Sequence, residues 1–187
     1  MTAFRLIESA VDTTDLDDFD SVVRLHWPRV FRFAMASLRD RDTAQSVAQD
    51  CLLRAYRARN DFRGEASIHT WLMRIAVNLV RDAARNRRFQ FWRRLRTTGV
   101  GTDTVSDWMP DRGISPEAKA MLKEQIEIAW TAVAGLSQKQ STVFLLRFVE
   151  DMDLLEIASV TGLTEGAVKV HLFRALQSIR RKVGKLI

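Results

Sequence analysis

The stretch that decides the fold is residues 152–185, MDLLEIASVTGLTEGAVKVHLFRALQSIRRKVGK. It predicts two helices joined by a tight turn, because Ala158, Gly162 and Val168 stand at the offsets of a helix-turn-helix motif. The alanine lets the helices cross closely, the glycine supplies the positive φ of the turn, and the valine returns an apolar side chain to the shared core. Thr164 is placed to cap the second helix through its hydroxyl.

The second of these helices has an apolar face and a basic face. The apolar stripe, at helical spacing, consists of Val168, Leu172, Ala175, Ile179 and Val183. The remaining face carries Lys169, Val170, Phe173, Arg174, Gln177, Arg180 and Arg181. Such a helix has the shape and the charge to lie in the major groove of DNA. The alternative is a helical hairpin whose basic face is merely solvated.

Charge is unevenly distributed along the chain. The 187 residues carry a formal net charge of +6, which favours a polyanionic partner. All charged residues in 8–20 are acidic, whereas all charged residues in 85–96 are arginines. Arginine suits bidentate contact with phosphate. A solvated arginine-rich surface is again the alternative.

Cysteine and histidine usage excludes several classes of site. A single cysteine, Cys51, precludes a disulfide framework, and its position on an apolar helix face favours buried packing. His26, His69 and His171 are far apart in sequence, and no spacing resembles a metal site. We expect neither metal nor cofactor. Without a membrane-spanning run or a signal peptide, we expect a cytoplasmic protein with no membrane insertion.

The whole chain favours an all-α fold of two small helical domains joined by a flexible linker, with the helix-turn-helix in the second domain. The expected boundaries are an acidic lead at 1–18, a first domain at 19–90, a linker at 91–116 and a second domain at 117–187. Helical periodicity covers residues 19–38, 42–59, 68–88 and 121–136 and is absent from the glycine- and proline-containing segment 89–116. Residues 142–149 are almost wholly apolar and are predicted to form a buried helix, followed by an acidic turn at 150–153.

Five residues give local predictions about helix ends and breaks. Pro28 is expected to kink or break the first helix. Asp42 is predicted to cap the second helix, with Gln45 completing a capping-box-like pair. Ser137 is predicted to cap a later helix with Gln140 at the capping-box position.

Two polar helix faces in the first domain are candidate binding surfaces. The face opposite the apolar stripe of residues 42–59 is interpreted from its composition as solvated. The helix at 68–88 places an aromatic side chain, an amide and three guanidinium groups on one face: Trp71, Arg74, Asn78, Arg81 and Arg85. These groups suit a single-stranded nucleic acid, because bases stack on aromatic rings and arginines bind phosphates. The alternative, favoured for an isolated tryptophan, is that Trp71 belongs to the core.

Three segments together resemble a known family. Residues 62–88, FRGEASIHTWLMRIAVNLVRDAARNRR, resemble the promoter-melting segment of bacterial sigma-70-family factors, and residues 42–59, DTAQSVAQDCLLRAYRAR, are similar to the polymerase-binding helix that precedes it. Residues 136–176, LSQKQSTVFLLRFVEDMDLLEIASVTGLTEGAVKVHLFRAL, are similar to the C-terminal domain of those factors. A short chain with only these two domains resembles the extracytoplasmic-function (ECF, group 4) sigma factors.

The resemblance implies a promoter-specificity subunit of RNA polymerase that is not an enzyme. Its partners would be core polymerase, through the clamp helices of the largest subunit and the flap of the second largest, promoter DNA and an anti-sigma factor. The implied polymerase contacts are Gln45, Gln49, Asp50, Leu53 and Arg54. The implied −10 contacts are Phe62, Arg63, Gly64, Trp71, Arg74, Asn78, Arg81 and Arg85. The implied −35 contacts are Thr164, Glu165, Lys169, Val170, His171, Phe173, Arg174, Arg180 and Arg181.

The chain departs from the family pattern at Val170 and His171, where members often carry Ser or Thr followed by Arg or Lys. Losing a hydroxyl and a fixed cation is expected to weaken phosphate contact and alter the −35 sequence that is recognised. Two other classes are kept as alternatives. One is a stand-alone helix-turn-helix regulator, which needs neither candidate face of the first domain. The other, much weaker, is a metal-dependent nuclease using the carboxylates of residues 12–20.

Overall fold

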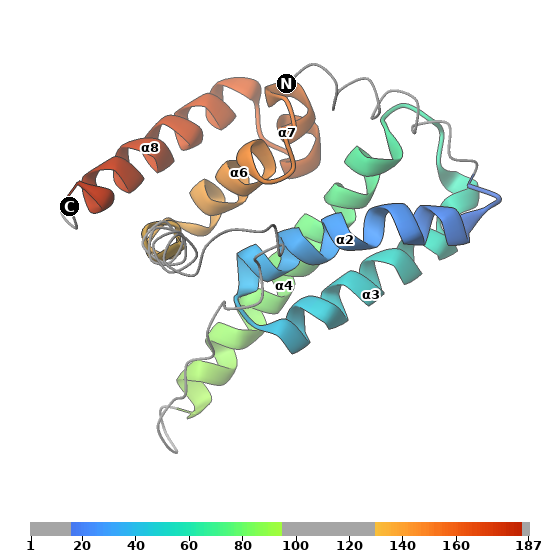
Figure 1. Ribbon diagram of the computed structural model, residues 1–187, viewed down its shortest axis with the longest axis horizontal. Coiled ribbons are helices and arrows are strands. Elements are labelled where there is room, and N and C mark those ends of the chain that lie inside the picture. Colours follow the sequence, from blue (N-terminus) through green and yellow to red (C-terminus); the bar gives the residue numbers. More distant parts are fainter. Residues whose placement is uncertain (1–15, 95–129, 185–187) are drawn as a thin grey trace, which may run out of the picture. The chain divides into compact units, whose positions relative to one another are not determined.

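The structure, a computed structural model, describes residues 16–94 and 130–184, with the backbone alone for 87–94. Within these ranges every regular element is a helix, which confirms the predicted all-α class. The chain divides into two compact units, the first containing α2, α3 and α4 and the second containing α6, α8 and most of α7 (Figure 1). Residues 1–15 and 95–129, which include most of the acidic lead, the predicted linker and part of the helix at 121–136, lie outside the described residues.

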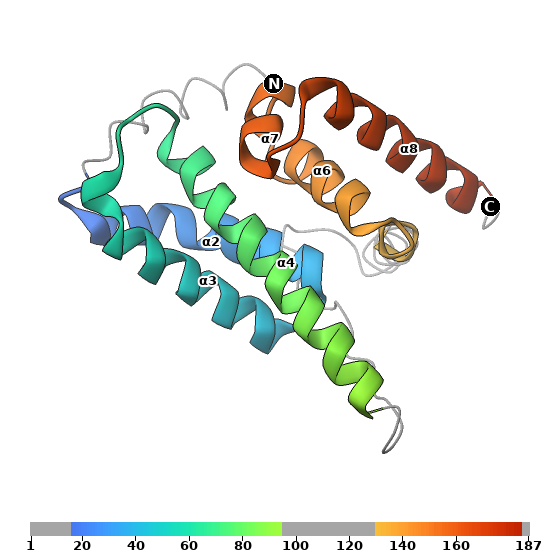
Figure 2. The ribbon, with the colours of Figure 1, turned by 180° about the vertical axis from the view of Figure 1, so that it is seen from behind.

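The first unit is a bundle of three helices, α2 (Phe19–Leu38), α3 (Arg41–Arg57) and α4 (Ile68–Arg94), with a 3-10 turn at Arg59–Asp61. Each helix packs against the other two, and α4 lies across the α2–α3 pair (Figure 2). The core is closed by fully buried side chains from all three helices, among them Val22, Val30, Phe33, Ala44, Ala48, Cys51, Leu72 and Met73. The bundle leaves the opposite faces of α3 and α4 to solvent.

The corner between α2 and α3 corrects the predicted cap. Arg39 adopts the left-handed conformation (φ 53°) and ends α2. Asp40 follows in an extended conformation, and its side chain accepts a hydrogen bond from the Thr43 amide at 2.7 Å. The cap is therefore Asp40, and the prediction of Asp42 is wrong because the left-handed residue starts the helix earlier. Asp42 lies in the first turn, where a negative charge is favourable.

Three further observations in the first unit bear on the sequence predictions. Pro28 lies inside an uninterrupted α2, so of the predicted kink or break the break does not occur. Leu25, an apolar residue of the same helix, is 39% exposed. Helix α4 continues to Arg94, past the predicted end near residue 88. The six predicted core positions of α3, by contrast, are all buried: Ala44, Val47, Ala48, Cys51, Leu52 and Ala55.

The second unit contains a helical segment at 130–134, then α6 (Gln138–Phe148), α7 (Leu154–Thr161) and α8 (Glu165–Val183). Helix α6 begins with the predicted capping box of Ser137 and Gln140 and packs against α8. The core of this second unit includes Val143, Leu145, Leu146, Met152, Ile157, Val168 and Ala175. The expectation that residues 142–149 form a fully buried helix is only partly met, because Phe148 is 54% exposed. Conversely, Glu150, expected in an acidic turn, is buried.

Candidate nucleic-acid interface

The helix-turn-helix forms as its sequence predicted. Gly162 takes up φ +71° and ends α7, its amide donating to the Ala158 carbonyl at 2.9 Å. Any residue with a Cβ would be strained in that conformation. Thr164 caps α8 through its hydroxyl, which accepts from the Ala167 amide at 3.2 Å. Val168 is completely buried. These contacts fix the direction in which α8 leaves the turn.

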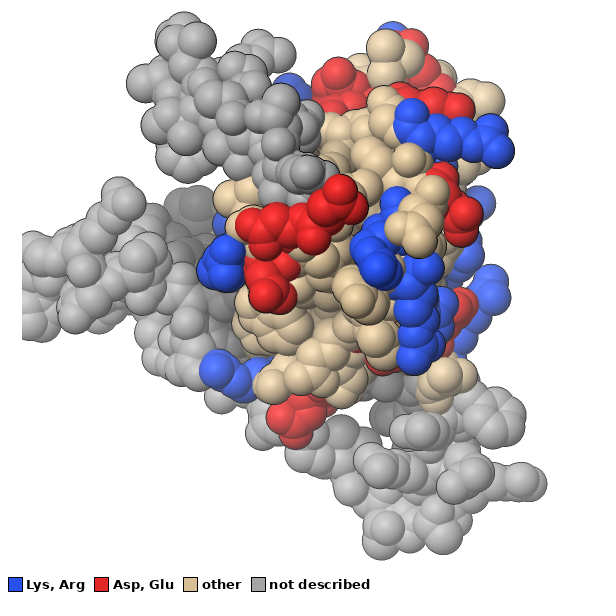
Figure 3. All heavy atoms as spheres, turned by 90° about the vertical axis from the view of Figure 1, so that its right-hand side faces the viewer, with Lys and Arg blue, Asp and Glu red and all other residues tan. Residues whose placement is uncertain are grey.

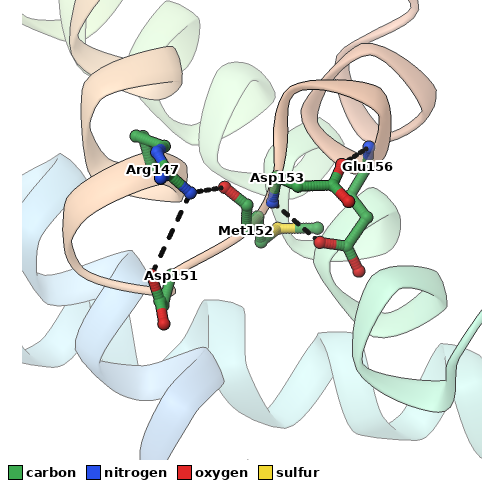
Figure 4. Close-up of polar contacts among 5 residues, drawn as sticks. All are labelled: Arg147, Asp151, Met152, Asp153 and Glu156. Atoms are coloured by element: carbon green, nitrogen blue, oxygen red, sulfur yellow. Dashed lines mark hydrogen bonds and ion pairs between the residues drawn. The ribbon is translucent and has the colours of Figure 1, made fainter. Parts of the chain in front are cut away.

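The entry into α7 is held by a second set of hydrogen bonds (Figure 4). Asp153 and Glu156 form a reciprocal capping box, each side chain accepting from the other's backbone amide at 2.8 Å. Arg147 donates to the Met152 carbonyl at 2.8 Å and lies 4.0 Å from the Asp151 carboxylate. The sequence analysis missed this box, although an Asp followed three residues later by Glu is its usual signal.

Most of the predicted −35 contacts lie on the exposed side of α8. The exposed members are Thr164, Lys169, Val170, Phe173, Arg174, Arg180 and Arg181. Glu165 is half-buried, and its carboxylate pairs with the Lys169 ammonium group at 2.6 Å. His171 is also half-buried, and its Nδ1 is enclosed without a hydrogen-bond partner in the described part of the chain. Because Lys169 is paired with Glu165, its charge on this surface is partly neutralised.

The polar face predicted on α4 is present. Arg74, Asn78, Arg81 and Arg85 are all exposed. Asn78 Oδ1 accepts a hydrogen bond from Arg81 at 2.7 Å, which leaves the amide NH₂ to donate to another acceptor. This pair also aligns the guanidinium group beside the amide.

At the start of α4, Trp71 is neither fully buried, as a core residue would be, nor fully exposed, as expected of a base-stacking residue. Its ring is half-buried and packs against Phe62 with centroids 5.0 Å apart. Arg63 and Gly64 in the preceding loop are exposed, and Gly64 has φ +71° with open space where a Cβ would lie. The loop and the start of the helix thus contain an aromatic pair, an exposed cation and a glycine with open space beside it, where a nucleic-acid strand could approach the backbone.

The outer face of α3 is polar with two apolar side chains in it. The predicted polymerase contacts are all exposed: Gln45, Gln49, Asp50, Leu53 and Arg54. Leu53 is 46% exposed, and Tyr56, which sequence reasoning missed, is 45% exposed. The Tyr56 ring packs edge-on against Phe19 and lies 4.0 Å beneath the Arg59 guanidinium group. Exposed apolar groups on a fixed helix face favour a protein partner.

His26 of α2 and His69 of α4, far apart in sequence, come together in the first unit. Both are buried, and their rings stack with centroids 6.1 Å apart. Burial, with the nearby Arg29, lowers the pKa of His26 to about 4 and, with further cations including Arg32, that of His69 to about 2. Across residues 16–94 and 130–184, no three His, Cys, Asp or Glu side chains gather as they would to hold a metal.

Cys51 is a buried, unreactive thiol. Its Sγ donates to the Leu72 carbonyl at 3.4 Å, and burial raises the pKa of the thiol to about 12. The predicted packing role is therefore confirmed, since reactive cysteines have lowered pKa values.

On the face drawn in Figure 3, several Lys and Arg side chains form a column and several Asp and Glu side chains gather beside it, while other charged side chains of both signs are scattered around them. In the described ranges, no helix is both long and apolar enough to cross a bilayer. An exposed basic helix that follows the turn of a helix-turn-helix is the feature that defines a DNA-binding protein.

The comparisons with known proteins identify the family. Residues 22–90 match the family described as Sigma-70 region 2, and residues 126–179 match Sigma-70, region 4. The chain is 30% identical to the RNA polymerase sigma-H factor of Pseudomonas aeruginosa, covering 95% of this chain and 92% of that one. It is 30% identical to the ECF RNA polymerase sigma-E factor of Escherichia coli K12, covering 75% of this chain and 74% of that one.

Among solved structures, the fold is similar to the sigma factor RpoE from Bartonella quintana, crystallised in complex with the anti-sigma factor NepR. The TM-score is 0.68 at 20% identity, covering 89% of this chain and 97% of that one. The chain belongs to the extracytoplasmic-function sigma factors of the sigma-70 family and is an RNA polymerase sigma factor.

Proposed function

We propose that this sigma factor holds core polymerase through α3, the opened −10 strand through α4 and the −35 duplex through α8. The observation that carries the proposal is that two separate helical units expose these three faces, one of them within a helix-turn-helix. We take residues 19–90 and 117–187 as the two functional domains and 91–116 as the linker between them. A stand-alone regulator would need no such pair of faces in its first unit.

The polymerase contact is assigned to the exposed side chains of α3, with Leu53 as its apolar centre and Gln45, Gln49, Asp50 and Arg54 around it. Tyr56 extends this surface, since its ring is already ordered by Phe19 and Arg59. In the second unit, the exposed Phe148 and Leu155 are the apolar candidates for the polymerase flap. Apolar anchors ringed by polar groups are typical of protein interfaces.

The −10 contact is assigned to the loop before α4 and to the exposed face of that helix. Phe62 and Trp71 offer ring surfaces on which an unpaired base stacks, and Asn78 offers amide donors to a base edge. Arg63, Arg74, Arg81 and Arg85 would bind the phosphates of the same strand. Taking a base out of the stack costs a few kcal/mol, which stacking and phosphate contacts would offset, so melting needs no ATP.

The −35 contact is assigned to α8, with Lys169, Val170, Phe173 and Arg174 nearest the bases and Arg180 and Arg181 on phosphate. Thr164, Glu165 and His171 complete this surface near the helix start. On this assignment the protein is a non-enzymatic initiation factor that acts in the cytoplasm. An anti-sigma factor is a further expected partner, supported by the complex in which the similar Bartonella quintana protein was crystallised.

The test is run-off transcription of genomic DNA with purified core polymerase and the full chain, followed by sequencing of the start sites. The expected result is a set of starts that share two upstream elements and vanish without the chain. A gel shift should show weak promoter binding by the chain alone and strong binding with core polymerase. Tight, sequence-specific binding by the chain alone would instead support the stand-alone regulator.

Substitutions separate the two DNA contacts. Lys169→Ala and Arg174→Ala should weaken transcription that depends on the −35 element, while leaving assembly with core polymerase intact. Because phosphate contacts release counterions, promoter binding should also fall steeply as salt is raised. Salt-independent binding would contradict the assignment of the arginines to phosphate.

A further inference from the structure

The side of α8 that faces away from its own core has an apolar centre. Residues Gly166, Val170, Phe173 and Gln177 follow one another at i, i+4, i+7 and i+11, which places them along one face of the helix. All four are exposed, Val170 at 47% and Phe173 at 66%. The completely buried Val168 lies on the opposite side. We call this row of four residues the central row.

Cations flank the central row on both sides. By helical spacing, Lys169 and Arg180 lie along one side and Arg174 and Arg181 along the other, and all four are exposed. The major groove of DNA has the same arrangement, with base edges along its floor and a phosphate backbone on each side. Charge therefore favours duplex DNA as the occupant of this face, with the central row towards the bases.

Within the central row, Val170 and Phe173 are the two side chains without a hydrogen-bonding group, and Val170 is the one that lies a single turn from Gly166. Gly166 contributes no side chain, and a Cβ placed there would meet nothing within 4 Å, so the groove can approach the helix closely at that point. The neighbouring Lys169 is held by Glu165 at 2.6 Å. Val170 itself can neither donate nor accept a hydrogen bond. The one apolar group that a base pair presents in the major groove is the 5-methyl group of thymine.

We propose that Val170 recognises the 5-methyl group of a thymine in the −35 duplex. The inference rests on the proposed function and specifies which feature of the promoter α8 discriminates. At this base pair, selection would come from an apolar contact, so a cytosine or a demethylated thymine would be disfavoured without any hydrogen bond being lost.

The experiment uses the full chain with core polymerase on the strongest promoter found by genomic run-off transcription. Each thymine of its −35 duplex is replaced in turn by deoxyuridine, which removes only the methyl group, and the holoenzyme dissociation constant is measured. One position should weaken binding about fourfold, the effect of about 0.8 kcal/mol for one buried methyl-sized group at about 1.4 kcal/mol per tenfold. Val170→Ala should bind the thymine and deoxyuridine promoters equally, whereas Val170→Ile should keep the preference for thymine.

Two results would overturn the inference. They are a −35 duplex with no sensitive thymine, and a Val170→Ala holoenzyme that still prefers thymine by the same factor as the parent. If that variant also binds both promoters more weakly by one common factor, Val170 contacts another part of the DNA or a protein. If the parent holoenzyme starts at no promoter, the proposed function fails first, and that result is seen before any deoxyuridine is introduced.

Discussion

The same substitution, valine to alanine, should destabilise the second unit at one position of α8 and leave its stability nearly unchanged at another position two residues away. Val168 is completely buried, so Val168→Ala removes two methyl groups from a closed core and leaves a small cavity. At about 0.8 kcal/mol per methyl-sized group plus a cavity term, the second unit should lose about 2 kcal/mol of stability. At about 1.4 kcal/mol per tenfold, that raises the population of the opened unit roughly thirtyfold.

Hydrogen exchange followed by mass spectrometry on the full chain measures this directly, because peptides from α8 report the opening of that helix. Amides of α8 should exchange roughly thirtyfold faster in Val168→Ala, while peptides of α3 and α4 stay unchanged. The matched control is Val170→Ala, which removes the same atoms from a side chain that is 47% exposed and should leave exchange nearly unaltered. Equal protection in Val168→Ala and the parent would refute the assignment of Val168 to the core.

The remaining predictions concern a cap, a pH dependence and promoter opening. Asp153→Ala removes one half of the α7 capping box and should cost about 1 kcal/mol, seen as faster exchange in α7; an unchanged rate would contradict the role of the box. The pKa values of His26 and His69 are lowered by burial, so below pH 6.5 the unfolded chain binds protons that the folded first unit does not. Its stability should therefore be complete above about pH 6.5 and fall as the pH drops towards 4, by about 2 kcal/mol per histidine at pH 5. Urea titrations at pH 7.5 and pH 5 test this, and His26→Gln should show a smaller loss; a pH-independent midpoint would contradict it. Asn78→Ala should assemble with core polymerase but open promoters poorly in permanganate footprinting, and parent-like footprints would contradict its −10 role.

Part of the candidate interface was accessible from sequence because helical spacing alone assigns a residue to a face. The polar positions of α3 and α4 predicted in this way are exposed. Spacing also places Tyr56 on the α3 face, three residues after Leu53 and seven after Gln49, and Glu165 stands four residues before Lys169, the spacing at which ion pairs form on a helix. What spacing could not predict is the edge-on contact of the Tyr56 ring with Phe19, because that residue belongs to another helix.

The turn and most of the helices could be predicted from the residues alone, because they depend on chemistry within a few positions. Gly162 adopts the positive φ that glycine tolerates, and the Ser137 and Thr164 hydroxyls cap the helices that follow them. Which apolar and ionisable groups are covered depends instead on tertiary packing. It buries Glu150 and stacks His26 on His69, yet leaves Phe148 largely exposed. The physical reason is that burial depends on surfaces brought together from distant parts of the chain, whereas a cap or a turn is completed within a few residues of its own position.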